Sequence, residues 1–382
     1  MPLTPYSRVL LAPDKFKGSL GAADVAASLK AGLLRALPEL SVLSMPVADG
    51  GDGTVDACVA AGFERRAAVV PGPLGEPIEA TFALRGDTAV VELAEASGLR
   101  RLPPGVLDPL HAHTRGTGAV IAAALDAGAR TVVLGVGGSA STDGGTGMLA
   151  ALGVRFLDAV GATVPEGGGG LDRIATVDLS GLDPRLAETE VLLASDVDNP
   201  LLGTRGAAAV YGPQKGATDQ DVQLLEGGLR NLVNALTTAT GERASWAVLQ
   251  PGAGSAGGVG YAALAVLRAH RRSGIELVLE TVGFAAALAE ADLVITGEGR
   301  LDAQTLHGKA PAGVAAAAQT KGVPVVGVCG MLQLTPDELA RAGFTRAYAL
   351  TDIEPDPAVC MAEAGPLLVV LGERIARDLS AG

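Results

Sequence analysis

Glycine-rich segments that carry Lys, Ser or Asp recur along the 382-residue chain, each after a short apolar run. Glycine lets backbone N–H groups approach an anion, and open α/β sheets bind ligands at the carboxyl ends of their strands. One such segment would be weak evidence, because the chain holds 53 glycines. The pattern occurs at 12–19 (APDKFKGS), 47–54 (VADGGDGT), 135–147 (GVGGSASTDGGTG), 195–201 with 211–216 (SDVDNPL, YGPQKG), and 296–311 (TGEGRLDAQTLHGKAP). Together these segments predict a site for a small phosphorylated or carboxylated ligand.

Lysine is scarce, since only six of the 29 basic residues are lysines. Four of the six lie in the glycine-rich segments: Lys15, Lys17, Lys215 and Lys309. A compact ammonium group serves a phosphate site as a point charge, whereas arginine suits planar bidentate pairing. Lys15 and Lys17 precede a predicted helix with Ser19 as its N-cap, and that helix would add partial positive charge. A solvated surface position is the alternative for each lysine taken singly.

Paired aspartates supply the opposite charge. Asp49 and Asp52 flank two glycines, and Asp196 and Asp198 alternate after an apolar run, which puts both carboxylates on one side of an extended segment. Such a pair can hold magnesium beside phosphate oxygens, although capping of local turns is the alternative. Transition-metal ligand spacing is missing from the sequence, as are the Walker, protein-kinase and nucleophile-elbow motifs.

Strand runs and helical patterns alternate at both ends of the chain. A strand run at 8–13 leads to a helical pattern over 21–38, where apolar residues recur every four positions. The other elements expected at the two ends are strands at 41–46, 292–296, 323–328 and 346–350 and helices at 54–61, 312–319, 336–342 and 357–378. Parallel strands need a crossover connection, usually a helix, so this alternation predicts an α/β fold with a parallel sheet.

The middle of the chain differs, because strand runs at 77–84 and 87–93 lie only two residues apart and predict an antiparallel hairpin. The length favours two domains. We expect residues 1–70 plus 285–382 to form one α/β domain and residues 71–284 to form an inserted mixed α/β domain, with Pro71, Gly72 and Pro73 at its entry. The glycine-rich segments come from both, which predicts an active site in the cleft between the domains.

Charge and composition exclude several classes of protein. The net charge is −13 and no basic block is present, which disfavours nucleic acid and anionic lipid as partners. Three widely spaced cysteines fit a reducing compartment better than a disulfide framework. The N-terminus has too short an apolar run for a signal peptide. These features predict a cytoplasmic protein that binds neither nucleic acid nor membranes.

The glycine-rich segments resemble those of the type 1 glycerate kinase family. Each segment is as the family has it or differs by one or two residues, and the segments occur in the family's order between about residues 8 and 375: APDKFKGSL, ADGGDGT, the stretch 92–99 ending ASGL, TRGTG, GVGGSASTDGG, DVDNPL, GPQKGA, PGAGSAGG and ITGEGRLDAQTLHGKAP. The chain departs from the family pattern at Ser141 and Thr142, where Thr-Asn is usual, and at Asp52, where Glu is usual.

The resemblance implies a two-domain α/β protein whose chain ends form a Rossmann-like domain. It also implies phosphorylation of D-glycerate with ATP and Mg2+, most often at the 2-hydroxyl to give 2-phosphoglycerate, and a possible homo-oligomer. Formation of 3-phosphoglycerate and a non-catalytic sugar-acid sensor are the alternatives. A nicotinamide-dependent dehydrogenase would need a GxGxxG segment, which the sequence lacks.

Phosphoryl transfer requires cations at the phosphate, magnesium on carboxylates and a carboxylate near the attacking hydroxyl. We therefore expect Lys15, Asp49 and Asp196 to be catalytic, with Asp196 and Asp198 as metal ligands. Lys17, Ser19, Asp52 and Arg300 are predicted to bind the substrate. The predicted nucleotide or phosphate ligands are Gly137, Gly138, Ser139, Lys215, Gly297, Gly299 and Lys309.

Overall fold

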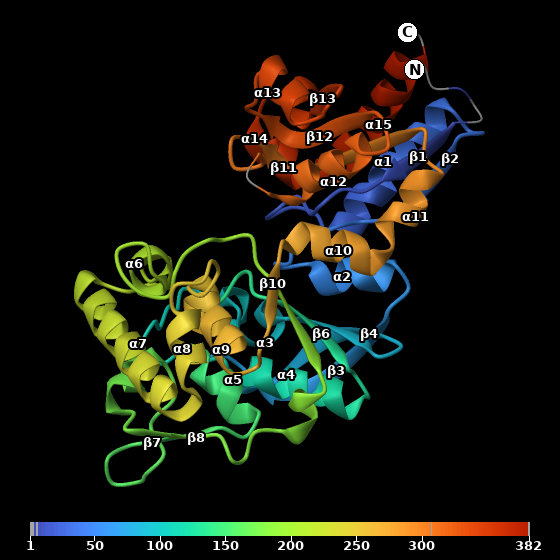
Figure 1. Ribbon diagram of the computed structural model, residues 1–382. Coiled ribbons are helices and arrows are strands. Elements are labelled where there is room, and N and C mark those ends of the chain that lie inside the picture. The colour runs from blue at the N-terminus through green and yellow to red at the C-terminus, as the bar shows by residue number, and fades with distance from the viewer. Residues whose placement is uncertain (1–3, 5–6, 307, 381–382) are drawn as a thin grey trace. The chain divides into compact units, whose positions relative to one another are not determined.

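The structure is a computed structural model that describes residues 4, 7–306 and 308–380 (Figure 1). His307, in the last glycine-rich segment, lies outside the described residues. The chain divides into two compact units: a terminal unit of residues 1–49, 56–62 and 275–382, and a central unit of residues 50–55 and 63–274. Each unit is built on its own sheet.

The terminal unit contains a five-stranded sheet in the order β13-β12-β11-β1-β2, with every neighbouring pair parallel. Figure 1 shows strands from both ends of the chain, blue and orange to red, in this one sheet. The strands are β1 (Arg8–Leu11), β2 (Ser41–Ser44), β11 (Leu293–Leu301), β12 (Val325–Leu332) and β13 (Arg346–Ala349). The prediction of a parallel sheet formed by both chain ends is confirmed.

Helices complete this unit: α1 (Ala22–Ala36), α11 (Phe284–Ala289), α12 (Ala310–Gln319), α13 (Pro336–Arg341), α14 (Pro357–Ala362) and α15 (Ala364–Ser380). Leu29 and Leu33 of α1 and Leu368 and Leu371 of α15 are fully buried in the same core. The two helices pack backbone to backbone, since a Cβ added at Gly32 would lie 2.0 Å from the carbonyl oxygen of Val369. This packing holds α1, the helix that follows the segment with Lys15 and Lys17, against α15.

The central unit has a six-stranded mixed sheet in the order β10-β9-β6-β5-β4-β3. The β4–β5 pair is antiparallel, as predicted for the hairpin. The β3–β4 pair, which was not predicted, is also antiparallel, and the other pairs are parallel. The strands are β3 (Glu64–Pro71), β4 (Pro77–Arg85), β5 (Thr88–Glu92), β6 (Thr131–Gly135), β9 (Glu190–Ala194) and β10 (His270–Arg272), with β7 (Arg155–Leu157) and β8 (Thr176–Asp178) as a separate pair. The molecule is therefore α/β, with one parallel and one mixed sheet.

The helices of this unit are α3 (Leu93–Ser97), α4 (Arg115–Asp126), α5 (Thr146–Ala151), α6 (Ala207–Tyr211), α7 (Asp219–Thr240), α8 (Glu242–Ala247) and α9 (Val259–Ala265). Two more, α2 (Thr54–Ala60) and α10 (Gly274–Val282), begin in the central unit and continue in the terminal unit. Short 3-10 helices lie at Leu99–Arg101, Gly168–Arg173, Pro184–Ala187, Pro213–Lys215, Ser255–Gly258 and Leu350–Asp352. Among the described residues, no helix combines the length and apolar character needed to cross a membrane.

Two predictions from the sequence differ from the structure: one concerns a domain boundary and the other a helix. Residues 64–70 were grouped with the chain ends, but β3 pairs along its whole length with β4 in the central sheet. The Pro71–Pro73 segment is thus part of a strand connection rather than a domain entry. The single helix expected at 357–378 is two helices, because Pro366 lacks the N–H that a continuous helix would bond to the Ala362 carbonyl.

Candidate functional site

The carboxyl ends of β1 and β11 form the point in the terminal sheet where the strand order reverses. The chain passes from β1 to β2 on one side and later returns as β11 on the other side of β1. Such switch points are the usual ligand-binding crevices of parallel α/β sheets. The segment after β1 continues along β11, with the Ala12 N–H donating to the Ile295 carbonyl at 2.8 Å and the Thr296 hydroxyl to the Ala12 carbonyl at 2.6 Å.

Three carboxyl groups interact electrostatically at this edge: Asp14, Asp49 and Glu298, which we call the Asp14 cluster. Burial raises the pKa of Asp14 to about 8, and the charges of Asp49 and Glu298 act in the same direction. Lys15 opposes this rise. Asp49 and Lys15 are among the residues predicted from the sequence, whereas Asp14 and Glu298 are not.

Glu298 has its own partners within this edge. Its Oε1 accepts a hydrogen bond from the Thr305 hydroxyl at 2.7 Å, and its Oε2 lies 3.3 Å from the ammonium of Lys309. Burial nevertheless raises the pKa of Glu298. Lys309 is therefore held beside the Asp14 cluster at the start of α12.

The remaining predicted residues of this unit lie near the same edge with different exposure. Lys15 is partly buried, while Lys17 and Arg300 are exposed. Ser19 does not cap α1, which begins after Gly21; its hydroxyl donates to the Met361 carbonyl at 2.5 Å. Ser19 thus anchors the loop to the last turn of α14.

The two predicted glycines of β11 serve different purposes. Gly297 is buried, and an added Cβ would lie 1.7 Å from the Val328 carbonyl oxygen, so glycine is required there by strand packing rather than by an anion. Gly299 is partly exposed and faces the backbone of Phe16 and Lys17. Of the two, only Gly299 borders the segment that carries the lysines.

In the central unit, residues 50–55 lie across the carboxyl edge of the sheet. An added Cβ would be 2.4 Å from the Gly50 carbonyl oxygen at Gly135 and 2.6 Å from the Gly51 Cα at Gly137. Close backbone packing therefore accounts for the absence of a side chain at Gly137. Ser139 is buried and bridges to Gly98, whereas Gly138 is exposed with a φ of 72°.

Glu92, the last residue of β5, holds residues 50–55 in place. The side chain is 1% exposed, and its Oε2 accepts hydrogen bonds from the N–H groups of Gly53 at 3.1 Å and Val55 at 3.3 Å. Arg100 pairs with Glu92 at 3.4 Å and also contacts Asp52 and Glu95. Burial raises the pKa of Glu92 to about 7, against the effect of Arg100. Asp52, predicted to bind substrate, is thus tied to Arg100.

Lys215 is buried rather than presented to a ligand. It is 1% exposed, and its ammonium donates to the Ser141 carbonyl. Burial lowers its pKa to about 7, while the charge of Asp143 acts in the opposite direction. The prediction of Lys215 as a phosphate ligand does not fit this burial, because a phosphate could reach the ammonium only after the loop had moved.

Asp143 organises the loop to which Lys215 is bonded. Its Oδ2 accepts from the Thr114 N–H at 2.9 Å, the Thr114 hydroxyl at 2.7 Å and the Gly147 N–H at 3.1 Å, and its Oδ1 from the Gly145 N–H at 3.1 Å. Thr142 is also buried, and its hydroxyl has no hydrogen-bond partner among the described residues. Segment 135–147 is therefore largely internal.

The predicted magnesium ligands already have protein partners. Asp196 Oδ1 accepts from the Gly274 N–H at 2.8 Å, and Asp198 pairs with Arg271 at 2.7 Å while 70% exposed. In the part of the chain that the structure describes, no group of three or more His, Cys, Asp and Glu residues is placed to hold a metal ion. The pair Asp196 and Asp198 does not fit a preformed magnesium site.

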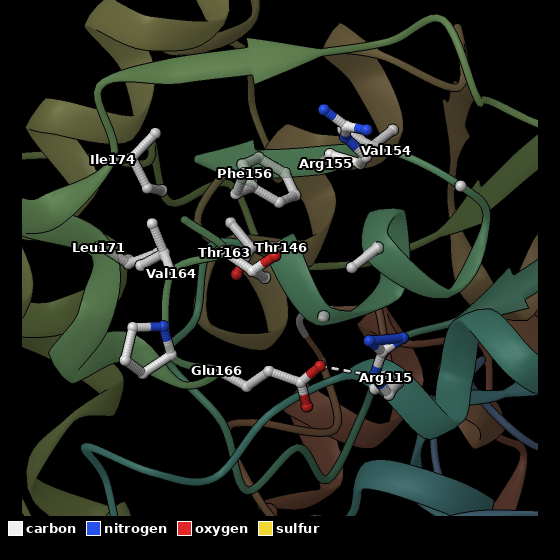
Figure 2. A pocket seen from close by; sticks show the side chains of 14 residues that line it. Arg115, Thr146, Val154, Arg155, Phe156, Thr163, Val164, Glu166, Leu171 and Ile174 are labelled. Atoms are coloured by element: carbon white, nitrogen blue, oxygen red, sulfur yellow. Dashed lines mark hydrogen bonds and ion pairs between the residues drawn. The ribbon is translucent and has the colours of Figure 1, made fainter. Parts of the chain in front are cut away.

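A separate cavity of about 270 Å³ lies in the central unit (Figure 2). Figure 2 shows Arg115 and Glu166 facing each other, with their Nε and Oε1 atoms 2.5 Å apart. Apolar side chains form much of the remaining wall: Val154, Phe156, Val164, Leu171 and Ile174. None of the residues predicted from the sequence to bind ligand lines this cavity.

Comparisons with known proteins cover almost the whole chain. The sequence model of the glycerate kinase family matches residues 9–380. Glycerate kinase of Bacillus subtilis (strain 168) is 45% identical over 377 residues, covering 98% of this chain and 97% of the relative. Glycerate 2-kinase of Escherichia coli (strain K12) is 44% identical over 329 residues, covering 85% of each. A crystal structure from Salmonella typhimurium LT2, assigned as a glycerate kinase 2, matches with a TM-score of 0.85 and 40% identity over 99% of both chains.

Proposed function

Because the chain belongs to the glycerate kinase family and is therefore a kinase, we propose that it transfers the γ-phosphoryl group of ATP to D-glycerate, as a type 1 member. The 2-hydroxyl is the proposed acceptor, and 2-phosphoglycerate is the proposed product. A relative 44% identical to this chain bears the name glycerate 2-kinase, which supports that choice. The alternative product is 3-phosphoglycerate.

The observation that carries the proposal is the pairing of cations with the Asp14 cluster at the switch point of the terminal sheet. Lys15 and Lys17 are proposed to hold the substrate carboxylate or the transferring phosphoryl group, and Asp49 to orient the attacking hydroxyl. Arg300 and Lys309 supply further positive charge at this edge. Phosphoryl transfer depends mainly on such positioning and charge neutralisation.

The exposed Gly138 is the best candidate for a backbone contact to phosphate in the central unit, because Gly137 and Ser139 are engaged in packing. Magnesium is proposed to enter with the nucleotide and to shield its phosphate charges. Asp196 and Asp198 do not fit a preformed site, because both already have protein partners. A shared ligand site between the two predicted domains, a homo-oligomer and a cytoplasmic location stay predictions.

A coupled assay of ADP release tests the proposal, with D-glycerate, L-glycerate or no acceptor, each with and without magnesium. We expect ADP release only with D-glycerate and magnesium, and phosphorus NMR of the product should show phosphate on the 2-oxygen. A product phosphorylated on the 3-oxygen would overturn the choice of hydroxyl. Binding of D-glycerate without ADP release would instead support the sugar-acid sensor.

A further inference from the structure

The carboxyl group of Asp14 is held rigidly at the switch point. The Asp14 N–H donates to the Gly297 carbonyl at 2.8 Å, which fixes its backbone against β11. Its Oδ1 accepts from the N–H of Lys15 at 2.6 Å, which fixes the side chain. The residue is 9% exposed. Its position is therefore determined before any ligand binds.

The second oxygen of this carboxyl group, Oδ2, accepts no hydrogen bond from the described residues. A buried carboxylate without donors is costly, so proteins normally supply partners or an ion pair. The other buried carboxyl groups of this chain have them: Asp143 accepts four hydrogen bonds, and Glu92 accepts two from backbone N–H groups and pairs with Arg100. Oδ2 of Asp14 can thus meet a small-molecule hydroxyl without displacing a protein donor.

The charged groups around Asp14 favour its protonated form. Asp49, from the loop after β2, and Glu298, from β11, both raise its proton affinity, whereas Lys15 on its own loop lowers it. Lys309 at the start of α12 acts on Glu298. Burial is the largest cause and, together with the charges of Asp49 and Glu298, raises the pKa of Asp14 to about 8 against the effect of Lys15. A base whose pKa lies near the working pH combines availability with a useful affinity for the proton.

We propose that Asp14 is a catalytic residue whose Oδ2 accepts the proton of the substrate hydroxyl during phosphoryl transfer. The O–H bond breaks as the hydroxyl oxygen forms its bond to the γ-phosphorus, and the bond from that phosphorus to the bridging oxygen breaks with its electron pair remaining on ADP. The proton resides on Asp14 and then passes to solvent. This role rests on the proposed function and leaves Asp49 to orient the hydroxyl.

The test compares Asp14→Asn and Asp14→Ser with Glu92→Gln as the matched control, since Glu92 is the other buried carboxyl group with a strongly raised pKa. For the Asp14 variants we expect kcat to fall by at least about a hundredfold, with KM for ATP changed by less than about threefold. The wild-type kcat should rise with pH through one ionisation between pH 6 and 9. This rising limb of the pH profile should be absent in Asp14→Asn. Glu92→Gln should keep both kcat and the limb.

Titration of carboxyl carbons by NMR with labelled aspartate provides a readout that does not depend on activity. We expect one aspartate signal that titrates near pH 8 and is lost in Asp14→Asn. An Asp14 signal that titrates below pH 5, or a folded Asp14→Asn protein that keeps more than a tenth of wild-type kcat and its pH limb, would overturn the proposal. A wild-type protein that does not phosphorylate D-glycerate would refute the proposed function itself. The two Asp14 results would refute only the role of Asp14.

Discussion

Asp14 of the terminal unit and Glu92 of the central unit are both buried carboxyl groups at the carboxyl edge of a sheet, yet their surroundings differ. Glu92 accepts hydrogen bonds from Gly53 and Val55 and pairs with Arg100. Asp14 accepts one hydrogen bond, from Lys15, and its electrostatic neighbours include the like charges of Asp49 and Glu298. Burial raises both pKa values, to about 7 and about 8 respectively.

The difference separates a structural carboxyl group from a functional one. Glu92 offsets part of its burial cost with partners that fasten residues 50–55, so the fold explains its presence. Asp14 has no comparable set of partners, and the fold would be more stable with a neutral residue there. Buried groups of that kind cluster at active sites, where function maintains them.

The largest effect that tests this contrast is on the pH dependence of stability. The pKa of Glu92 rises from 4.5 to about 7 on folding, so the folded state binds more protons than the unfolded state in that window, and stability falls as pH rises through it. Glu92→Gln removes this fall. The free energy of unfolding of the variant, relative to that of wild type, should therefore be about 3 kcal/mol higher above pH 7 than below pH 4.5.

Urea unfolding of both proteins across this pH range provides the measurement. Asp14→Asn should show the same direction over its own window, from 3.8 to about 8, so both variants gain stability relative to wild type as pH rises, whereas only Asp14→Asn is expected to lose turnover. An equal difference from wild type at all pH values would show that folding leaves the pKa of Glu92 at its ordinary value of 4.5.

A slightly smaller effect is expected from the cation beside Asp14. Lys15→Met should reduce turnover by at least a hundredfold, or about 2.7 kcal/mol, because an ammonium that neutralises the transferring phosphoryl charge is lost. Lys321, exposed after α12 and remote in sequence from the glycine-rich segments, provides the matched control as Lys321→Met. Steady-state kinetics on both folded variants decides the matter, and near wild-type turnover in Lys15→Met would remove Lys15 from the site.

The smallest effect is predicted for Asp198, whose carboxyl group is exposed, in contrast to those of Asp14 and Glu92. The Asp198 carboxylate, which pairs with Arg271, is largely exposed to solvent. Asp198→Asn should therefore change the free energy of unfolding by less than about 0.5 kcal/mol. The Asp198→Asn variant should also need the same magnesium concentration for half activity as wild type. Asp196→Asn should need a higher concentration if the Asp196 carboxylate contributes to metal binding. Titration of activity with magnesium measures both, and a shared increase would restore the pair as metal ligands.

The sequence predicts the region of the candidate site more fully than the individual roles of its residues. Glycine-rich segments after predicted strands led to Lys15 and Asp49, and the alternation of elements predicted the parallel sheet. Asp14 was overlooked beside Lys15, because burial and neighbouring charge depend on which strand ends meet in space. Gly137 was assigned to phosphate for a similar reason: a sequence does not distinguish a glycine that approaches an anion from one that approaches another backbone segment, here Gly51.

The pairing of β1 with β11 has a consequence for synthesis of the chain. The Thr296 hydroxyl and the Ala12 carbonyl that join these strands are 284 residues apart in sequence. Every strand of the central unit, β3 to β10, has been synthesised before β11 begins at Leu293. Since domains fold as units during synthesis and contacts between distant residues form slowly, the central unit can fold first while β1 and β2 wait for their partner. The loop with Lys15 and Asp14 is therefore among the first segments made and among the last to reach its final structure.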